Sequence, residues 1–178
     1  MPFTRRSMLL CAFAFGLSGC ASAPAEPDAT TQPVTLVSAF QGHRTGKGEF
    51  RIWLTGAKRR FTADLNGQVT GAAGHRKLTV TEDFAYDDGQ KDRLTWVFQE
   101  TGPGQWSGKR EDTVGVATVV EENGQIRLDY KADFKSLSGT TRLGFSDLIY
   151  GLADGTLIND GIVSRSGIPV AAVRFVIR

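Results

Sequence analysis

Apolar and charged side chains alternate without a break in one stretch of the chain, Ile126-Arg127-Leu128-Asp129-Tyr130-Lys131-Ala132-Asp133-Phe134. Successive side chains of a β-strand point to opposite faces, whereas helical positions recur every 3.6 residues. The row therefore predicts a strand with one buried and one solvated face. A lone strand cannot bury its apolar face, so the same period should recur elsewhere in the chain.

The period of two does recur along the chain, and turn residues interrupt it at intervals of eight to twelve residues, which is typical of an antiparallel β protein. The apolar rows are Phe50, Ile52 and Leu54; Phe61, Ala63 and Leu65; Leu78, Val80, Phe84 and Tyr86; and Val170 to Ile177, which is apolar on both faces. The turn signals are Asp88-Gly89, Gly102-Pro103-Gly104, Asn123-Gly124 and Asp154-Gly155.

These rows and turns predict an all-β domain of about ten strands joined by local connections, without a convincing amphipathic helix. The chain contains 21 glycines, which favour strong bending of the sheet. A closed sheet also removes exposed strand edges. We therefore expect an antiparallel up-and-down β-barrel.

The N-terminus has the parts of an export signal: Arg5 and Arg6 form a basic start, and an apolar run extends from Met8 to Leu17. The run has about ten residues, whereas a helix that spans a bilayer needs roughly 20. Leu17-Ser18-Gly19-Cys20 looks like the lipobox of bacterial lipoproteins, which are cleaved before a cysteine that carries lipid. We expect a signal peptide at 1–19 and lipidation of Cys20.

The residue after Cys20 is Ala21 rather than aspartate, which in such lipoproteins favours the periplasmic leaflet of the outer membrane. The alternative is an ordinary secretory peptide that is cut after Ala21 or Ala23. Residues 20–34 contain three prolines and no apolar period, so we expect a flexible tether there and the barrel domain at 35–178.

Composition restricts the chemistry of the mature chain. The precursor has 21 Lys and Arg against 19 Asp and Glu, and loss of Arg5 and Arg6 leaves 19 against 19, so nucleic acid is not an expected partner. Cys11 leaves with the signal and Cys20 is acylated, so no free thiol is left for catalysis or metal binding. With only His43 and His75 as imidazoles, we expect no metal site and no cofactor.

Three charged residues interrupt apolar rows and are the candidates for a functional site. Glu82 is in register with Val80 and Phe84, Asp147 continues the row of Leu143 and Phe145, and Arg174 stands between Ala172 and Val176. A buried carboxylate is costly unless it is paired. The three could form a polar spot in an apolar cavity and bind a ligand head group, or Glu82 and Asp147 could act as an acid–base pair. The alternative is a structural ion pair near the barrel rim.

Aromatic residues supply further candidates. Tyr130 belongs to the inward row of the opening stretch, and Trp96 shares a row with Leu94 and Phe98, so both are predicted to line a ligand, although core packing also explains Trp96. Trp53 lies in the polar register and is the best candidate for an exposed contact with a partner or a membrane interface. Asp87-Asp88-Gly89 lacks the ligand spacing of a calcium loop and is better explained as a hairpin turn.

Several segments, in this order, resemble DUF3833, a family of bacterial lipoproteins without assigned activity. They are Phe40-Gln41-Gly42, Gly46, Gly48, Arg60-Phe61, Glu82-Asp83-Phe84, Tyr86-Asp87-Asp88-Gly89, Arg93, Trp96, Gly108, Val114-Gly115, Ala117, Tyr130, Phe145, Asp147, Tyr150, Asp154, Ile158-Asn159, Ser164, Gly167-Ile168 and Phe175. The resemblance covers nearly all of residues 40–178 and implies an envelope lipoprotein with a lipocalin-like barrel. It implies no catalytic residues.

The chain departs from the family pattern in two places. The family tends to have paired acids and a tryptophan where this chain has Ser146-Asp147-Leu148, and a second acid near Arg110-Glu111-Asp112. If those acids share a chemistry in the family, this chain has lost part of it.

Three functions follow as alternatives. The leading one is a membrane-tethered barrel that binds a hydrophobic or lipid-like molecule for envelope lipid homeostasis. The second is a lipid-modifying enzyme that uses Glu82 and Asp147, although a non-catalytic role is favoured. The third is a non-enzymatic envelope assembly factor that presents a surface around Trp53 to a protein partner whose identity the sequence does not give.

Overall fold

The computed structural model describes Pro24, residues 31–136 and residues 139–178. The predicted signal peptide at 1–19, Cys20 and most of the predicted tether therefore lie outside the described residues. Within the described part of the chain, no helix has the length and apolar character needed to cross a membrane.

The described residues form one short helix and eleven strands. In chain order they are β1 (Thr31–Gln32), α1 (Leu36–Phe40), β2 (Gly42–Ile52), β3 (Lys58–Thr70), β4 (Lys77–Tyr86), β5 (Lys91–Gly102), β6 (Gln105–Lys109), β7 (Ala117–Glu122), β8 (Gln125–Ser136), β9 (Gly139–Leu152), β10 (Leu157–Arg165) and β11 (Ile168–Ile177).

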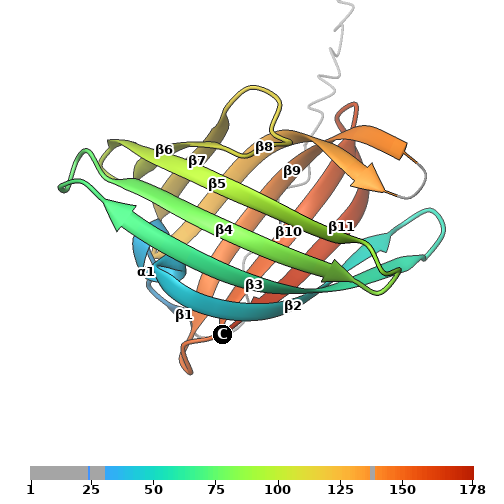
Figure 1. Cartoon of the computed structure of the whole chain (residues 1–178), viewed down its shortest axis with the longest axis horizontal. Helices are drawn as coiled ribbons and strands as arrows, with labels where there is room; N and C mark the ends of the chain where they lie inside the picture. The colour runs from blue at the N-terminus through green and yellow to red at the C-terminus, as the bar shows by residue number, and fades with distance from the viewer. Residues whose placement is uncertain (1–23, 25–30, 137–138) are drawn as a thin grey trace, which may run out of the picture.

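Strands β2 to β11 close into a ten-stranded antiparallel barrel, which confirms the predicted fold class (Figure 1). Each strand pairs with the next one along the chain, and β11 pairs with β2 to close the ring. All of these pairs are antiparallel, as short hairpin connections require. The two-residue β1 lies outside this ring and pairs with the end of β9, where Gln32 stands opposite Gly151.

The barrel interior is built from the predicted apolar rows. Phe61, Ala63 and Leu65 of β3 are buried, and so are Ile126, Leu128 and Ala132 of β8. Glycine makes room for rings on the strongly bent β2, because a Cβ on Gly48 would collide with the ring of Phe61. The ring of Phe61 on β3 can therefore lie over Gly48 of the neighbouring strand β2 inside the barrel.

The two ends of the barrel differ. The end where β2 starts and β3 stops is covered by α1, whose Leu36 and Ala39 are fully buried. Thr35 caps this helix: its Oγ1 accepts a hydrogen bond from the Ser38 amide, while Ser38 Oγ accepts one from the Thr35 amide. The helix stops against β3, where a Cβ on Gly67 would collide with the carbonyl of Phe40.

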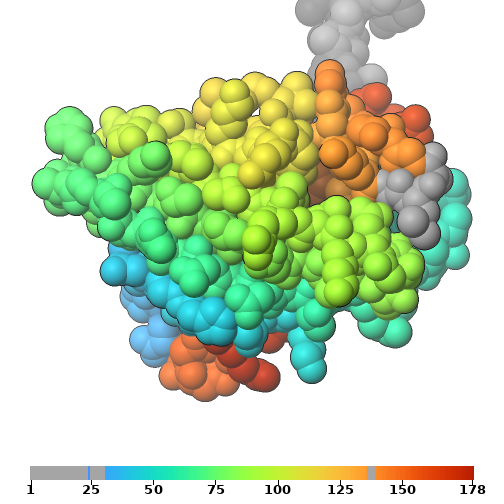
Figure 2. Space-filling view, in the orientation of Figure 1, coloured from blue at the N-terminus to red at the C-terminus, as the bar shows by residue number. Residues whose placement is uncertain are grey.

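The opposite end is formed by hairpins and is less completely covered. The hairpins β2–β3, β4–β5, β8–β9 and β10–β11 all turn at this end. In the space-filling view most gaps between the strands are filled by side chains, and a shaded recess remains between the orange surface of β9 and the green surface of β5 (Figure 2). We call this the open end and the end covered by α1 the closed end.

Two details differ from the predictions. Residues 31–34 belong to the predicted tether, but Thr31–Gln32 pair with β9 and the Val34 amide donates to the Gly124 carbonyl. The edge of β9 near Leu152 is available because β8 pairs with β9 only as far as Ile149. Leu54 does not continue the inward row of Phe50, because β2 ends at Ile52 and Leu54 is 95% exposed in the following turn.

Candidate functional site

The barrel contains a cavity of about 690 Å³, which lies within the size range of small-molecule sites. Its lining reaches Arg93, Lys135 and Thr140, which are exposed, so the cavity communicates with solvent at the open end. The lining residues are Phe40, Phe50, Val80, Glu82, Phe84, Tyr86, Asp92, Arg93, Leu94, Trp96, Phe98, Arg110, Glu111, Asp112, Thr113, Val114, Leu128, Tyr130, Asp133, Phe134, Lys135, Thr140, Phe145, Asp147, Ile149, Asn159, Val173, Phe175 and Ile177.

Aromatic side chains form the wall toward the open end. The ring of Phe134 on β8 lies 5.8 Å from that of Phe50 on β2, although these strands are not neighbours in the sheet. Phe61 contacts Phe50 at 5.4 Å, Phe84 at 5.5 Å and Phe175 at 5.1 Å between ring centroids. These spacings are typical of favourable tilted and edge contacts. The cavity therefore has an apolar region that suits a flat or flexible apolar molecule.

Arg110 reaches the middle of the cavity because of where β6 ends. Trp106 and Gly108 of β6 face inward and are buried, so Arg110, two residues further on, keeps the inward register. The chain turns directly after it: the Thr113 amide donates to the Arg110 carbonyl, and Thr113 Oγ1 accepts from the Arg110 amide. The turn fixes the direction in which Arg110 leaves the wall.

The segment after Arg110 seals the wall between β5 and β8, which the short strands β6 and β7 leave incomplete. The Thr95 amide of β5 donates to Glu111 Oε2, and the Asp133 amide of β8 donates to the Asp112 carbonyl. The Val114 amide donates to the carbonyl of Lys131. We call residues 110–116 the wall loop. It places both Arg110 and Asp112 at the cavity.

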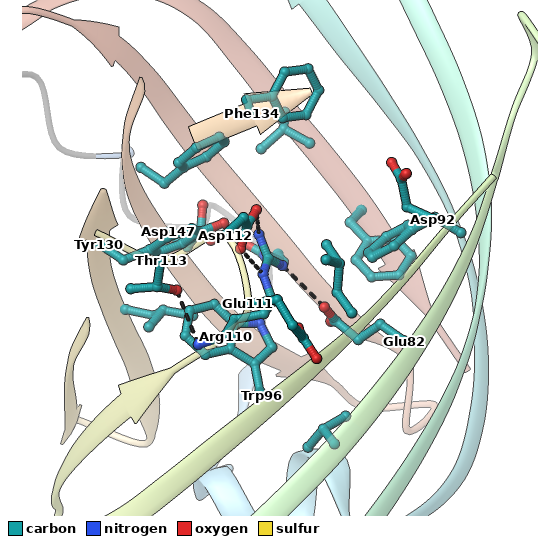
Figure 3. A pocket seen from close by; sticks show the side chains of 18 of the residues that line it. Glu82, Asp92, Trp96, Arg110, Glu111, Asp112, Thr113, Tyr130, Phe134 and Asp147 are labelled. Atoms are coloured by element: carbon teal, nitrogen blue, oxygen red, sulfur yellow. Dashed lines mark hydrogen bonds and ion pairs between the residues drawn. The ribbon is translucent and has the colours of Figure 1, made fainter. Parts of the chain in front are cut away.

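Arg110 is held by two carboxylates and two aromatic rings (Figure 3). Its Nη1 donates to Glu82 Oε2 at 3.1 Å, while Nε and Nη2 donate to the two oxygens of Asp112 at 2.8 and 3.0 Å. The guanidinium carbon lies 4.8 Å from the ring centre of Trp96 and 5.4 Å from that of Tyr130. These contacts fix the guanidinium plane in the middle of the barrel.

Burial controls the protonation of this cluster. It raises the pKa of Glu82, and the adjacent Arg110 only partly opposes that shift. The carboxylates of Glu82 and Asp112 keep the pKa of Arg110 above its usual value despite the burial of the guanidinium. Burial also raises the pKa of Tyr130, so its phenol stays protonated. The cluster thus contains a permanent cation and a carboxyl group, Glu82, that holds its proton more readily than in water.

Asp147 lies on the side of the cavity formed by β9 and β10. Figure 3 shows it beside Tyr130 and Asp112, across from Glu82. It is 6% exposed, and burial raises its pKa to about 7, against the opposing effects of the Asn159 amide and the Arg110 guanidinium. Asp147 stands opposite Gly161, where a Cβ would collide with its Oδ1, so glycine at 161 makes space for the carboxyl group.

Four of the five predicted ligand-lining residues meet at the cavity: Glu82, Trp96, Tyr130 and Asp147. Arg174 does not, which corrects that prediction. Val173 and Phe175 take the inward register of β11, so Arg174 points outward, where its side chain is 62% exposed and lies 3.2 Å from Asp160. The apolar neighbours Ala172 and Val176 had suggested burial because the outer face of β9 to β11 carries its own apolar cluster, with Leu148 and Ile158.

Three site residues were missed in the sequence: Arg110, Asp112 and Asn159. The signal for Arg110 was present, because the inward register of Trp106 and Gly108 extends to position 110. The signal for Asn159 was its spacing from Leu157 and Gly161, which face the interior. Asp112 had no comparable signal, since it lies in a loop whose path depends on β5 and β8.

Trp53, the predicted exposed contact, lies in the turn after β2 and is 47% exposed, next to Leu54. Its backbone amide donates to the carbonyl of Val170, so the turn is held to β11. His43 contacts Asp64 on the outer surface at 2.9 Å. Among the described residues, no three His, Cys, Asp or Glu side chains are grouped as metal ligands would be.

Fold and interior together define the class: a closed, lipocalin-like antiparallel β-barrel with an internal cavity that contains a fixed arginine–carboxylate cluster. The chain belongs to the family described as "Protein of unknown function (DUF3833)", whose sequence pattern matches residues 14–178. This confirms the resemblance. The curated proteins contain no sequence match to the chain.

A solved structure with a similar fold is the S-type phycobiliprotein lyase CPES from Guillardia theta. Its TM-score is 0.57 at 9% sequence identity, and the alignment covers 78% of this chain and 86% of the lyase. At this identity the similarity establishes the shared fold. The barrel architecture is therefore common to both proteins.

Proposed function

We propose that this protein binds a hydrophobic or lipid-like small molecule inside its barrel while Cys20 anchors it to the periplasmic face of the outer membrane. The observation that carries the proposal is the cavity of about 690 Å³, which is lined by aromatic rings yet reaches solvent at the open end. A barrel whose only task was structural would gain stability from filling that volume with side chains.

Two further observations support the proposal. The phenylalanines around Phe61 provide an apolar wall, and the cluster around Arg110 provides fixed polar groups, which is the combination typical of small-molecule sites. The Guillardia theta protein with this fold is a phycobiliprotein lyase, so a barrel of this architecture serves a lyase there. For the membrane location, the support is the lipobox at Leu17–Cys20, and a role in envelope lipid homeostasis would follow from that location.

An enzymatic role is the second candidate, and one observation favours it. Asp147 has a pKa of about 7, which suits a group that exchanges a proton near neutral pH. Its predicted partner Glu82 is occupied by Arg110, so an acid–base pair would depend on Asp147 as the proton-exchanging member. The assembly-factor hypothesis rests on the exposed turn at Trp53 and Leu54 and stays a prediction.

The test is to purify the full chain gently from the outer-membrane fraction and identify small molecules in its extract by mass spectrometry. We expect an apolar molecule in near-stoichiometric amount with the wild type. Leu94→Trp adds a ring on the cavity side of β5 and should expel the molecule, whereas Val97→Trp adds the same ring on the outer face of that strand and should retain it. An empty wild-type chain, or equal amounts of the molecule in both variants, would contradict the proposal.

A further inference from the structure

We propose that the ligand of this cavity carries a basic nitrogen, such as an alkyl or aryl amine, and that the carboxylate of Asp147 receives it. This inference rests on the proposed function and specifies the class of molecule that the barrel selects. An acidic amphiphile such as a fatty acid should be bound less well than the amine.

The first observation is that Asp147 is buried without a full set of hydrogen-bond partners. Its Oδ1 has no partner among the described residues, and neither has Oδ1 of Asn159. In the sheet, Asp147 stands opposite Gly161 and Ile149 stands opposite Asn159, so the two polar side chains share the inward face of adjoining positions. Both line the cavity. Buried polar atoms in native proteins almost always have partners, so a pair of unsatisfied acceptors at a cavity wall calls for a donor from a ligand.

The second observation is the charge balance at the middle of the cavity. Three carboxyl groups, those of Glu82, Asp112 and Asp147, face a single guanidinium, that of Arg110. Nε and Nη2 of Arg110 are already bound to Asp112, and Nη1 is bound to Glu82. An incoming carboxylate or phosphate would therefore meet further carboxyl groups beside a cation that Asp112 and Glu82 already flank on two sides. A cationic head group would instead restore the balance.

The third observation concerns the geometry around Asp147. Gly161 provides the space that the carboxyl group occupies, since a Cβ there would collide with Oδ1. The aromatic rings of Tyr130 and Phe145 stack at 4.7 Å on the neighbouring wall, and Trp96 meets Tyr130 edge to face at 5.1 Å. The apolar remainder of such a ligand would extend toward Phe134 and Phe50 at the open end.

The experiment compares three probes that share an apolar chain and differ only in the head group: octylamine, octanol and octanoate. Binding to the purified full chain is measured at pH 8 by displacement of the neutral dye Nile red. At this pH an alkylamine is still cationic, because its pKa is close to that of lysine, about 10.4, and Asp147 is mostly ionised. We expect octylamine to bind at least about tenfold more tightly than octanol, and octanoate to bind most weakly.

Asp147→Asn keeps the shape of the side chain and removes its charge. We expect this variant to bind octanol as the wild type does, while the preference for octylamine falls to less than about threefold. Asp64→Asn is the matched control, because it makes the same change on the outer surface, where Asp64 is paired with His43 and does not line the cavity. It should leave the amine preference unchanged.

The outcomes separate the two proposals. If Nile red and all three octyl compounds fail to bind, the cavity does not take apolar molecules and the proposed function is wrong. If Nile red and octanol bind but octylamine binds no better, or if Asp147→Asn keeps the amine preference, only the present inference is overturned. Retained octanol binding by Asp147→Asn shows that this variant has folded.

Discussion

The barrel contains two buried glutamates that are each paired with an arginine, and the two pairs behave in opposite ways. Glu100 of β5 pairs with Arg76 at the closed end, where their side chains approach to 2.6 Å. Glu82 of β4 pairs with Arg110 in the cavity at 3.1 Å. The pKa of Glu100 is lowered to about 2, whereas the pKa of Glu82 is raised.

The number of donors accounts for the difference. Glu100 accepts four hydrogen bonds, from the amides of Gly74 and Arg76 and from Nε and Nη2 of Arg76. Each of these bonds favours the ionised carboxylate. Glu82 accepts one bond, from Arg110, and that arginine is shared with Asp112. Desolvation consequently prevails over pairing at Glu82 and not at Glu100.

The two glutamate–arginine pairs have different roles. The four bonds to Glu100 tie the loop between β3 and β4 to β5, so this pair holds the closed end together. The Glu82–Arg110 pair stands in a cavity and leaves one carboxylate incompletely satisfied, which proteins tolerate where a ligand binds. The same two residue types therefore serve a structural role at one end and a proposed binding role in the middle.

The largest effect should come from removing Arg110. We expect Arg110→Met to lower the free energy of unfolding by about 3–5 kcal/mol at pH 7, because it leaves the buried carboxylates of Glu82 and Asp112 without their cation. Urea unfolding followed by tryptophan fluorescence measures the loss. Lowering the pH should restore part of it, since protonation of Glu82, whose pKa burial already raises, removes unpaired charge.

Arg76→Met is the matched variant and should cost less. The Arg76 side chain is 29% exposed, and Glu100 would keep the amide donors of Gly74 and Arg76 after the change. An equal or greater loss in Arg76→Met would show that the closed-end pair, and not the cavity cluster, is the more heavily buried charge. That result would reverse the comparison.

The next effect concerns acid. The pKa of Glu100 is about 2 in the folded chain and 4.5 in the absence of its partners. Between these values the unfolded chain takes up a proton that the folded chain does not, so the stability contributed by Glu100 is complete above pH 4.5 and is lost as the pH falls toward 2. We expect Glu100→Gln to be less stable than the wild type at pH 6, with the difference shrinking steadily below pH 4.5.

Urea unfolding of both chains from pH 2.5 to pH 7 provides the measurement. Asp64→Asn serves as the control, because it changes an exposed carboxylate on the outer face. Gln99→Glu would be unsuitable, because it adds a charge. If the difference between wild type and Glu100→Gln does not change with pH, the bonds around Glu100 are not selective for its ionised form.

The sequence predicts the fold well because the alternation of side chains survives in nearly every strand. The row Ile126 to Phe134 faces inward as expected, and ten strands close the barrel. The failures occur where the period gives no information. Leu54 follows the end of β2, and the pairing of Thr31–Gln32 with β9 depends on an edge that is exposed only because β8 stops pairing at Ile149.

Part of the site could be predicted from the sequence, for the same reason. Glu82, Tyr130 and Asp147 were found because each interrupts or belongs to an inward row of a regular strand. Arg174 was placed inside because both faces of β11 are apolar, and the pattern alone cannot tell which face lines the cavity. Asp112 was missed because the wall loop obtains its course from hydrogen bonds to β5 and β8, which no local pattern encodes.

The smallest effect should come from Glu82→Gln, which tests directly whether the two glutamates differ. Glutamine keeps an oxygen that can accept from Arg110, while Asp112 still supplies the counter-charge, so we expect the free energy of unfolding to change by no more than about 1 kcal/mol at pH 5. Because the folded chain raises the pKa of Glu82, the wild type loses stability as the pH rises from the unfolded value of 4.5 through the folded value.

Glu82→Gln has no such group, so it should gain stability relative to the wild type as the pH increases, the opposite trend to that of Glu100→Gln. Thermal melts at pH 5 and pH 8 measure this trend. A variant that is less stable than the wild type by the same amount at both pH values would mean that Arg110 satisfies Glu82 as completely as Arg76 satisfies Glu100. The cavity cluster would then be a second structural tie, and Asp147 alone would be left as the polar group available to a ligand.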